Sequence, residues 1–185
     1  MSQTNDRFFV ALLPSQAIHD YANEVKQVFV DRYNSRAALK SPPHITLQPP
    51  FEWSMTAYPA LSETLKAFAA QFTPIPVALS GFGAFAPRVI YINVIKSPTL
   101  LTLQATLAKC LEESLGIVHT ESKARSYTPH MTVGFRDLTP ENFELAWAEF
   151  QQRPLELEFV ASHLTLLQHD GHDWKVDAEF PFLDN

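Results

Sequence analysis

The spacing of apolar residues along the chain predicts helices and strands in alternation. Residues 7–14, RFFVALLP, form a short apolar run that ends at proline, which is typical of a buried strand. From Ser15, an expected N-cap, apolar residues recur every three or four positions, as on one face of a helix. The same period predicts helices at about 58–72, at 97–116 and from Thr139 onward.

The remaining apolar segments predict strands. They lie at 75–85, 89–95, 155–168 and 174–182, and the last two are expected to form a hairpin that turns at 169–173. An order of strand, helix, strand, strand occurs twice, over units of about 40–96 and 125–181. We therefore expect one domain over residues 1–185, built from a duplicated α+β unit whose two lobes are related by a pseudo-twofold axis and share a cleft.

Two short stretches repeat one pattern at the start of these units. They are SPPHITLQPPF at 41–51 and SYTPHMTVGF at 126–135. In each, proline precedes a histidine and a threonine that are separated by one apolar residue. Alternate side chains of a strand point to opposite faces, so His44 shares a face with Thr46, and His130 shares a face with Thr132. The apolar residues between them face the core, and the repetition indicates one site built from both units.

Two histidines and two hydroxyl groups that face each other suit the cleavage of a phosphodiester without a metal. Imidazole, with a pKa of roughly 6.5, can take a proton from the attacking oxygen or give one to the leaving oxygen at neutral pH. Hydroxyl groups can donate hydrogen bonds to the phosphoryl oxygens, where charge collects. A zinc site is the competing interpretation, but zinc takes three or four ligands and neither motif contains Asp or Glu. We expect no metal and no cofactor.

Composition narrows the partners and the compartment. The chain has 185 residues, a net charge of −6 and one cysteine, Cys110, so it has no disulfide framework. An acidic protein is not expected to bind duplex nucleic acid. The net charge therefore favours a small nucleotide or an RNA end as the ligand. The N-terminus lacks a signal-peptide pattern, and no apolar run approaches the roughly 20 residues that span a bilayer. We expect a cytoplasmic monomer without membrane contact.

The paired motifs resemble those of the 2H phosphoesterase superfamily, which includes 2′-5′ RNA ligase-like proteins and cyclic phosphodiesterases. Its two His-x-Thr-x motifs, with apolar residues at x, are matched here by residues 44–47 and 130–133. Residues 7–14, 79–107 and 126–135 are similar to its opening strand, its middle segment and its second motif block. The resemblance implies a two-lobed α+β fold of antiparallel sheets, with helices packed outside and a central cleft. It also implies metal-independent hydrolysis of a 2′,3′-cyclic phosphate to a 2′-phosphate.

Carried over to this chain, the resemblance makes His44 and His130 the catalytic acid and base, and Thr46 and Thr132 the groups that hold the phosphate. The near symmetry of the motifs leaves open which histidine is the base. Many relatives place a basic residue five positions after the second histidine, but this chain has Phe135 there. Arg136 follows, and strand alternation puts it on the His130 face. Further candidates for substrate binding are the basic residues Lys40, Arg88 and Arg125, and Tyr127 as a ring that could stack on a base.

Two other functions fit the same motifs. One is a nucleotide-binding module that keeps the fold but does not catalyse, which the missing basic residue at position 135 favours. The other is a 2′-5′ RNA ligase, against which the acidic net charge argues mildly because a large RNA attracts basic surfaces. Loss of turnover in histidine variants, as opposed to a change in binding alone, separates the enzyme from the binding module.

Overall fold

The computed structural model describes residues 5–120 and 125–184. The domain predicted over 1–185 therefore includes positions 1–4, 121–124 and 185, which lie outside the described residues. In chain order the elements are β1 (Asn5–Leu12), α1 (Gln16–Tyr33), the 3-10 helix η1 (Ala37–Lys40), β2 (Ile45–Ser54), η2 (Met55–Ala57), α2 (Tyr58–Ala69), β3 (Ile75–Phe85), β4 (Val89–Val94), α3 (Pro98–Leu115), β5 (His130–Gly134), α5 (Pro140–Phe150), β6 (Glu156–Ala161), β7 (His163–His169) and β8 (Trp174–Pro181).

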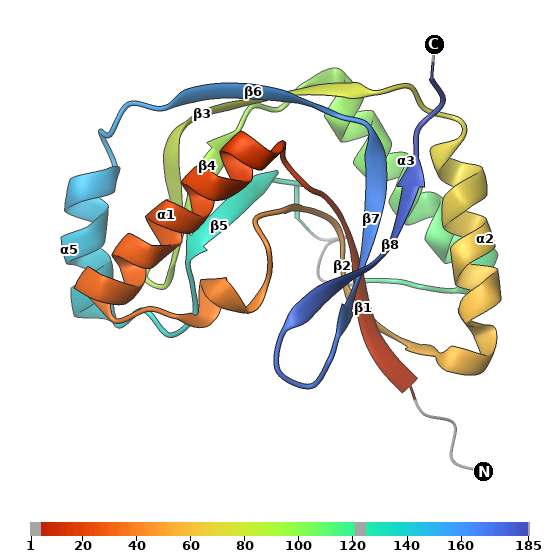
Figure 1. Ribbon diagram of the computed structural model, residues 1–185, viewed down its shortest axis with the longest axis horizontal. Coiled ribbons are helices and arrows are strands. Elements are labelled where there is room, and N and C mark those ends of the chain that lie inside the picture. The colour runs from red at the N-terminus through yellow and green to blue at the C-terminus, as the bar shows by residue number, and fades with distance from the viewer. Residues whose placement is uncertain (1–4, 121–124, 185) are drawn as a thin grey trace.

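Two antiparallel four-stranded sheets form the centre of the molecule. The first sheet has the strand order β2-β1-β7-β8, and the second has the order β5-β4-β3-β6. Helices α1 and α5 lie on one side of the sheets, and α2 and α3 lie on the opposite side (Figure 1). This arrangement confirms the predicted α+β fold of two antiparallel sheets with helices outside. No helix in the described part of the chain combines the length and apolar character needed to cross a membrane.

The two strands that carry the motifs are both edge strands. Among the described residues, β2 pairs with β1 alone and β5 with β4 alone, so each strand leaves one edge without a ladder partner there. These two edges lie against each other, since β2 contacts β5. Pro49 and Pro50 fit this position in β2, because a residue without an N–H is tolerated at the edge of a sheet. The repeated motifs therefore meet where the two sheets adjoin.

Each sheet is covered by a helix that the other sheet supplies. Helix α1 follows β1 of the first sheet but packs against β5 of the second, and α3 follows β4 of the second sheet but packs against β2 of the first. The contact of α1 with β5 is close at Gly134, where a Cβ atom would come within 2.5 Å of the Phe29 ring. Glycine at this position lets the helix approach the strand that carries His130.

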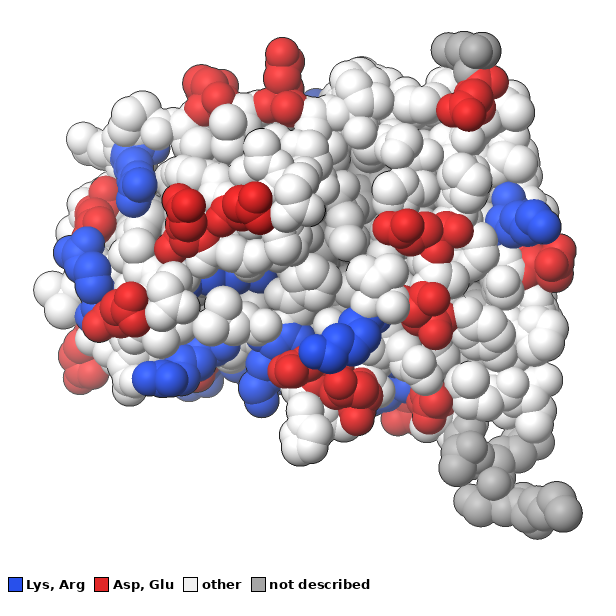
Figure 2. Space-filling view, viewed as in Figure 1, with Lys and Arg blue, Asp and Glu red and all other residues white. Residues whose placement is uncertain are grey.

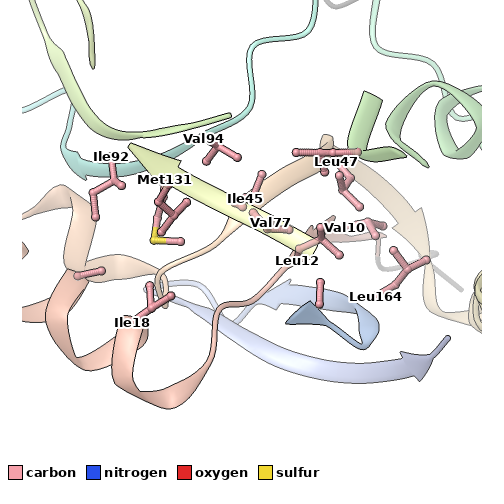
Figure 3. Close-up of a cluster of buried hydrophobic side chains, with 14 of the residues drawn as sticks. Val10, Leu12, Ile18, Ile45, Leu47, Val77, Ile92, Val94, Met131 and Leu164 are labelled. Atoms are coloured by element: carbon pink, nitrogen blue, oxygen red, sulfur yellow. The ribbon is translucent and has the colours of Figure 1, made fainter. Parts of the chain in front are cut away.

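The core shows the predicted alternation along the motif strands. Ile45 and Leu47 on β2 are buried, as are Met131 and Val133 on β5. Figure 3 shows Ile45, Leu47 and Met131 among apolar side chains from both sheets and from α1. Since neighbouring residues on a strand point to opposite faces, burial of these four turns the histidines and threonines away from the core.

Most predicted helix ends are confirmed, and one predicted strand is wrong. The Ser97 side chain accepts a hydrogen bond from the Leu100 amide, and Gly116 ends the same helix in a left-handed conformation. Ser15 occupies the N-cap position of α1, but its side chain makes no capping hydrogen bond. Residues 155–168 do not form one strand: they split at Ser162 into β6 of the second sheet and β7 of the first. Only β7 and β8 form the hairpin.

The two predicted sequence units do not coincide with the two sheets. Unit 40–96 supplies β2 to the first sheet and β3 and β4 to the second, while unit 125–181 supplies β7 and β8 to the first sheet and β5 and β6 to the second. By position, β1-α1-β2 in the first sheet corresponds to β4-α3-β5 in the second, because each places a motif strand at the edge beside the strand that precedes its helix. Linear order alone does not reveal this pairing.

Candidate active site

Both motifs line one cavity of about 430 Å³ where the two sheets adjoin. β2 brings Thr46 and the preceding His44 to it, and β5 brings His130 and Thr132. The structure thus assembles in one place the four residues that the sequence singles out. The rest of the lining comes from β1, the segment around η1, Pro50 on β2, the residues that follow β5, and the β7–β8 hairpin.

The two imidazoles are held in the same way. Nδ1 of His44 donates to the carbonyl oxygen of Pro42 at 2.7 Å, and Nδ1 of His130 donates to that of Thr128 at 2.7 Å. A carbonyl oxygen can only accept, so each Nδ1 carries a proton. This fixes the ring orientation and the tautomer, and it leaves Nε2 of each histidine to exchange a proton with a ligand.

The surroundings of the two imidazoles differ in charge. Burial lowers the pKa of His44 to about 4, against the hydrogen bond to Pro42, and the positive charges of Lys26 and His130 lower it further. Burial also lowers the pKa of His130, where the hydrogen bond to Thr128 opposes it. His44 is therefore neutral at neutral pH and able to accept a proton, and it alone has the lysine charge acting on it.

Lys26 is a buried cation behind the first motif. It lies on α1, only 1% of its surface is exposed, and its Nζ donates to the carbonyl oxygen of Ser41 at 2.8 Å. Burial lowers the pKa of Lys26 to about 8. The sequence reasoning missed this residue, although a signal exists: Lys26 falls four positions after Ala22 and four before Val30, beside the apolar stripe of the helix. Lysine is rarely fully buried without a partner.

An aromatic wall flanks His44. The Phe9 ring lies 4.8 Å from the His44 ring and 4.7 Å from the Trp174 ring, and the His169 ring lies 4.9 Å on from Trp174. The Arg7 guanidinium lies over Trp174 at 5.5 Å. The sequence reasoning gave His169 and the nearby His172 no role, and it did not single out the other three. The structure places all of them in the lining of the cavity.

The cavity is positively charged although the protein is acidic. Arg7, Lys40 and Arg136 line it, and no Asp or Glu among the described residues does. Arg136 lies over the ring of Phe135, at 4.5 Å, so the cation reaches the cavity one position later than in many relatives of the predicted family. Figure 2 shows Lys and Arg, with Asp and Glu beside them, along the lower middle of one face, where Figure 1 places the turn between β7 and β8. Such a rim attracts anions.

Asp137 ties the segment after β5 to the segment before β2. Its carboxylate accepts hydrogen bonds from Ser35 Oγ at 2.7 Å, from the Arg36 amide at 2.6 Å and from the Ala37 amide at 2.9 Å. Burial raises the pKa of Asp137, but the hydrogen bonds together lower it by more, so the pKa lies below its usual value. Because η1 contributes Lys40 to the cavity, this carboxylate fixes part of the wall of the cavity.

A second cavity of about 410 Å³ adjoins the first and shares Thr46 and His130 with it. Tyr127 and Arg125, both predicted substrate-binding residues, line this second cavity rather than the first. The Tyr127 hydroxyl donates to the carbonyl oxygen of Thr46 at 2.8 Å, across the junction between the motif strands. Arg88, the remaining candidate, lies in the exposed turn between β3 and β4 and lines neither cavity.

The competing zinc interpretation finds no ligand set in the described part of the chain. No group of three or more His, Cys, Asp or Glu side chains there is arranged to hold a metal ion. The first cavity offers a ligand the two motif imidazoles and two motif hydroxyl groups, with His169 and His172 farther along the wall and a cationic rim.

Sequence relatives match this chain over nearly its whole length. A family model described as the 2′-5′ RNA ligase superfamily matches residues 14–173. A protein of Geobacillus sp. (strain WCH70), provisionally named a phosphoesterase, is 30% identical over 177 residues, which is 94% of this chain and 95% of that protein. A protein of Bacillus mycoides (strain KBAB4) with the same kind of name is 32% identical over 174 residues, which is 92% of this chain and 94% of that protein.

Solved structures share the fold at lower sequence identity. LigT of E. coli, complexed with 3′-AMP, superposes with a TM-score of 0.70 at 18% identity and covers 98% of this chain and 100% of its own. The protein TT0787 of Thermus thermophilus superposes with a TM-score of 0.68 at 18% identity and covers 95% of this chain and 97% of its own. At this identity the likeness establishes the fold, and the chemistry has to be argued from the residues of this chain.

Proposed function

Since the chain belongs to the 2′-5′ RNA ligase superfamily, whose activity is of the phosphoesterase type, we propose that it hydrolyses a 2′,3′-cyclic phosphate on a small nucleotide or RNA end to a 2′-phosphate. One observation carries the proposal: two histidines, each with Nδ1 bound to a backbone carbonyl, line the same cavity beside two threonines. With these groups, one imidazole can take a proton on one side of a phosphorus atom while the other gives a proton on the opposite side.

We assign the base to His44 and the acid to His130. Lys26 is buried behind His44, bound to the carbonyl of Ser41, and its charge disfavours a second positive charge on that imidazole. A neutral Nε2 on His44 accepts a proton from the attacking water. His130 lacks such a cation and protonates the leaving 3′-oxygen.

The hydroxyl groups and the rim act on the phosphate. Thr46 and Thr132, which line the cavity, donate hydrogen bonds to the two phosphoryl oxygens that do not take part in bond making or breaking. Arg136 and Lys40 supply positive charge for the developing negative charge of the transition state. The protein LigT, which shares the fold, has been crystallised with 3′-AMP, with NADP+ and with ATP, and this agrees with a nucleotide as the ligand.

A second function is favoured by one observation. Phe135 stands where many relatives of the predicted family carry a cation, so a protein that binds nucleotides without turning them over keeps the same cavity. A 2′-5′ ligase reaction would use the same groups, because joining reverses the departure of an alcohol oxygen from phosphorus.

The test is turnover of the four nucleoside 2′,3′-cyclic monophosphates in the presence of EDTA, with the 2′- and 3′-phosphate products resolved. We expect the wild type to form the 2′-phosphate, and His44→Ala and His130→Ala each to lower kcat by at least about a hundredfold. His19→Ala is the matched control, because His19 lies on α1 and lines neither cavity.

Two outcomes contradict the proposal. If the wild type binds the nucleotides but does not turn them over, the binding module replaces the enzyme. If His19→Ala loses as much activity as the motif variants, the loss does not come from the site.

A further inference from the structure

The segment that leads into the first motif, residues 35–41, is fastened at its start by a residue that follows the second motif. That residue is Asp137, and its carboxylate accepts a hydrogen bond from the Ser35 hydroxyl at 2.7 Å. The carboxylate also accepts from the amides of Arg36 and Ala37, at 2.6 and 2.9 Å. Ser35 is only 1% exposed, so the first of these bonds is formed at a buried hydroxyl. We call residues 35–41 the η1 segment.

The far end of the η1 segment brings a cation to the first cavity. The segment contains one short 3-10 helix, Ala37–Lys40, and Lys40 at its end lines the cavity. The Ser41 carbonyl that follows is bound separately by Lys26, at 2.8 Å. Asp137 therefore fixes the point where this short helix begins, while the chain next to His44 keeps an anchor of its own.

Both oxygens of Asp137 are engaged by the η1 segment. Oδ1 accepts from Ser35, and Oδ2 accepts from the two amides. Arg136, the neighbour of Asp137 along the chain, lies over the Phe135 ring and lines the same cavity as Lys40. Two cations of the wall thus come from two segments that one carboxylate joins.

We propose that Asp137 is a positioning residue, which holds Lys40 where its ammonium group meets the phosphate of the ligand. Lys40 then supplies, from the segment before the first motif, the positive charge that many relatives of the family carry at the position of Phe135. The inference rests on the proposed function, because it takes a phosphate ester as the ligand of the first cavity.

The sign of the effect separates this role from a direct effect of charge. A carboxylate near a phosphate repels it, so by charge alone the removal of Asp137 would strengthen the binding of an anionic ligand. If Asp137 acts through Lys40, its removal weakens binding, and the loss disappears once Lys40 is absent.

The experiment is a double-mutant cycle between these two residues. The wild type, Asp137→Ala, Lys40→Ala and the double variant are compared by kcat/KM for adenosine 2′,3′-cyclic monophosphate and by Kd for adenosine 2′-monophosphate. We expect each single variant to lower kcat/KM and to weaken binding about tenfold. We expect the double variant to lose at most about twofold beyond Lys40→Ala, whereas independent residues would give a loss of about a hundredfold.

Two further variants grade the effect. Asp137→Asn keeps one oxygen that can accept from both amides, so it should lose at most about threefold. Ser35→Ala removes one of the three hydrogen bonds and should give a smaller loss than Asp137→Ala, again only while Lys40 is present. This variant replaces Asp137→Ala in the cycle if Asp137→Ala does not fold.

Asp177→Asn is the matched control. The Asp177 carboxylate is also exposed and accepts a hydrogen bond from the Tyr58 hydroxyl, but it lines neither cavity. Its kcat/KM and Kd should equal those of the wild type.

Each contrary outcome has a distinct meaning. Losses that multiply in the double variant, tighter binding in Asp137→Ala, or equal losses in Asp137→Asn and Asp137→Ala each overturn the positioning role and leave the proposed function standing. A wild type that binds adenosine 2′-monophosphate without turning over the cyclic phosphate overturns the proposed function, and the cycle in Kd then decides the role of Asp137. A wild type that does neither overturns both.

Discussion

The two motif histidines are alike in their own chemistry and different in their surroundings. Each follows a proline, each is bound through Nδ1 to the carbonyl two residues before it at 2.7 Å, and each starts or precedes an edge strand. Behind His44 lies the buried ammonium of Lys26, and against it lies Phe9. His130 instead packs against Phe85 and Tyr91, at 5.0 Å each, and opens to both cavities.

A repeated motif can therefore supply two opposite roles. The motif itself specifies an imidazole with a fixed tautomer, which serves equally as an acid or a base. The role follows from neighbours that the motif does not contain. Among the described residues, the buried charge of Lys26 acts on His44 and not on His130, which favours His44 as base and His130 as acid.

The largest expected effect comes from changing the leaving group. A p-nitrophenolate departs without protonation, so an ester with this leaving group relieves the need for the acid but not for the base. On a nucleoside p-nitrophenyl phosphodiester we expect His130→Ala to lose at most about tenfold in kcat/KM. We expect His44→Ala to lose about 10² to 10⁴, the usual contribution of general base catalysis. Absorbance of p-nitrophenolate gives the rates, and equal losses in the two variants would break the assignment.

The second effect concerns the buried lysine. The pKa of Lys26 is about 8 in the folded chain and about 10.5 when exposed, so between these values the unfolded state binds more protons and the free energy of unfolding rises with pH. From pH 8 to pH 10.5, the free energy of unfolding of the wild type should rise by up to about 3 kcal/mol more than that of Lys26→Met. Urea denaturation measures both. Lys109→Met, at an exposed site, should show no such trend against the wild type.

The same variant also tests whether Lys26 lowers the pKa of His44. The pKa of His44 is about 4 partly because of the Lys26 charge, and activity that needs neutral His44 is lost as the pH falls through that value. Lys26→Met should therefore move the acid limb of the kcat/KM profile to higher pH. An acid limb that stays in place would show that Lys26 does not act on the base.

A smaller effect is expected from the hydrogen bond that joins the segment before β5 to strand β2. Tyr127→Phe removes the single hydrogen bond from its hydroxyl to the Thr46 carbonyl, and one such bond contributes about 1 kcal/mol to stability. Urea denaturation should show a loss of that order. Tyr21→Phe is the matched control, because among the described residues no hydrogen bond is formed by the Tyr21 hydroxyl. An equal loss in both variants would mean that the Thr46 carbonyl is satisfied in other ways.

The sequence predicted what is local and repeated. His44, Thr46, His130 and Thr132 were found because strand alternation acts between neighbours and because the pattern occurs twice. The capped helix that starts after Ser97 was found for the same reason, since its signals lie within one turn of its ends. Lys40 and Arg136 were predicted because each lies a few positions along the chain from a motif histidine, and both line the first cavity.

The parts that the sequence did not predict depend on long-range pairing. Arg7, Phe9 and Trp174 reach the site because β1 pairs with both β2 and β7, and β7 pairs with β8. Nothing near these residues along the chain marks that arrangement. The break at Ser162 was missed because no Gly or Pro separates β6 from β7, so the sequence does not show that the two strands join different sheets.

The exchange of helices α1 and α3 between the sheets has a consequence for how the molecule comes apart. Each sheet loses one of its covering helices when the other sheet unfolds, although α2 also packs against the first sheet and α5 against the second, so neither sheet keeps its full core alone. Melting is therefore expected as one cooperative transition. Until that transition, heat should not spread the two imidazoles apart, and the active site should persist as long as the fold itself.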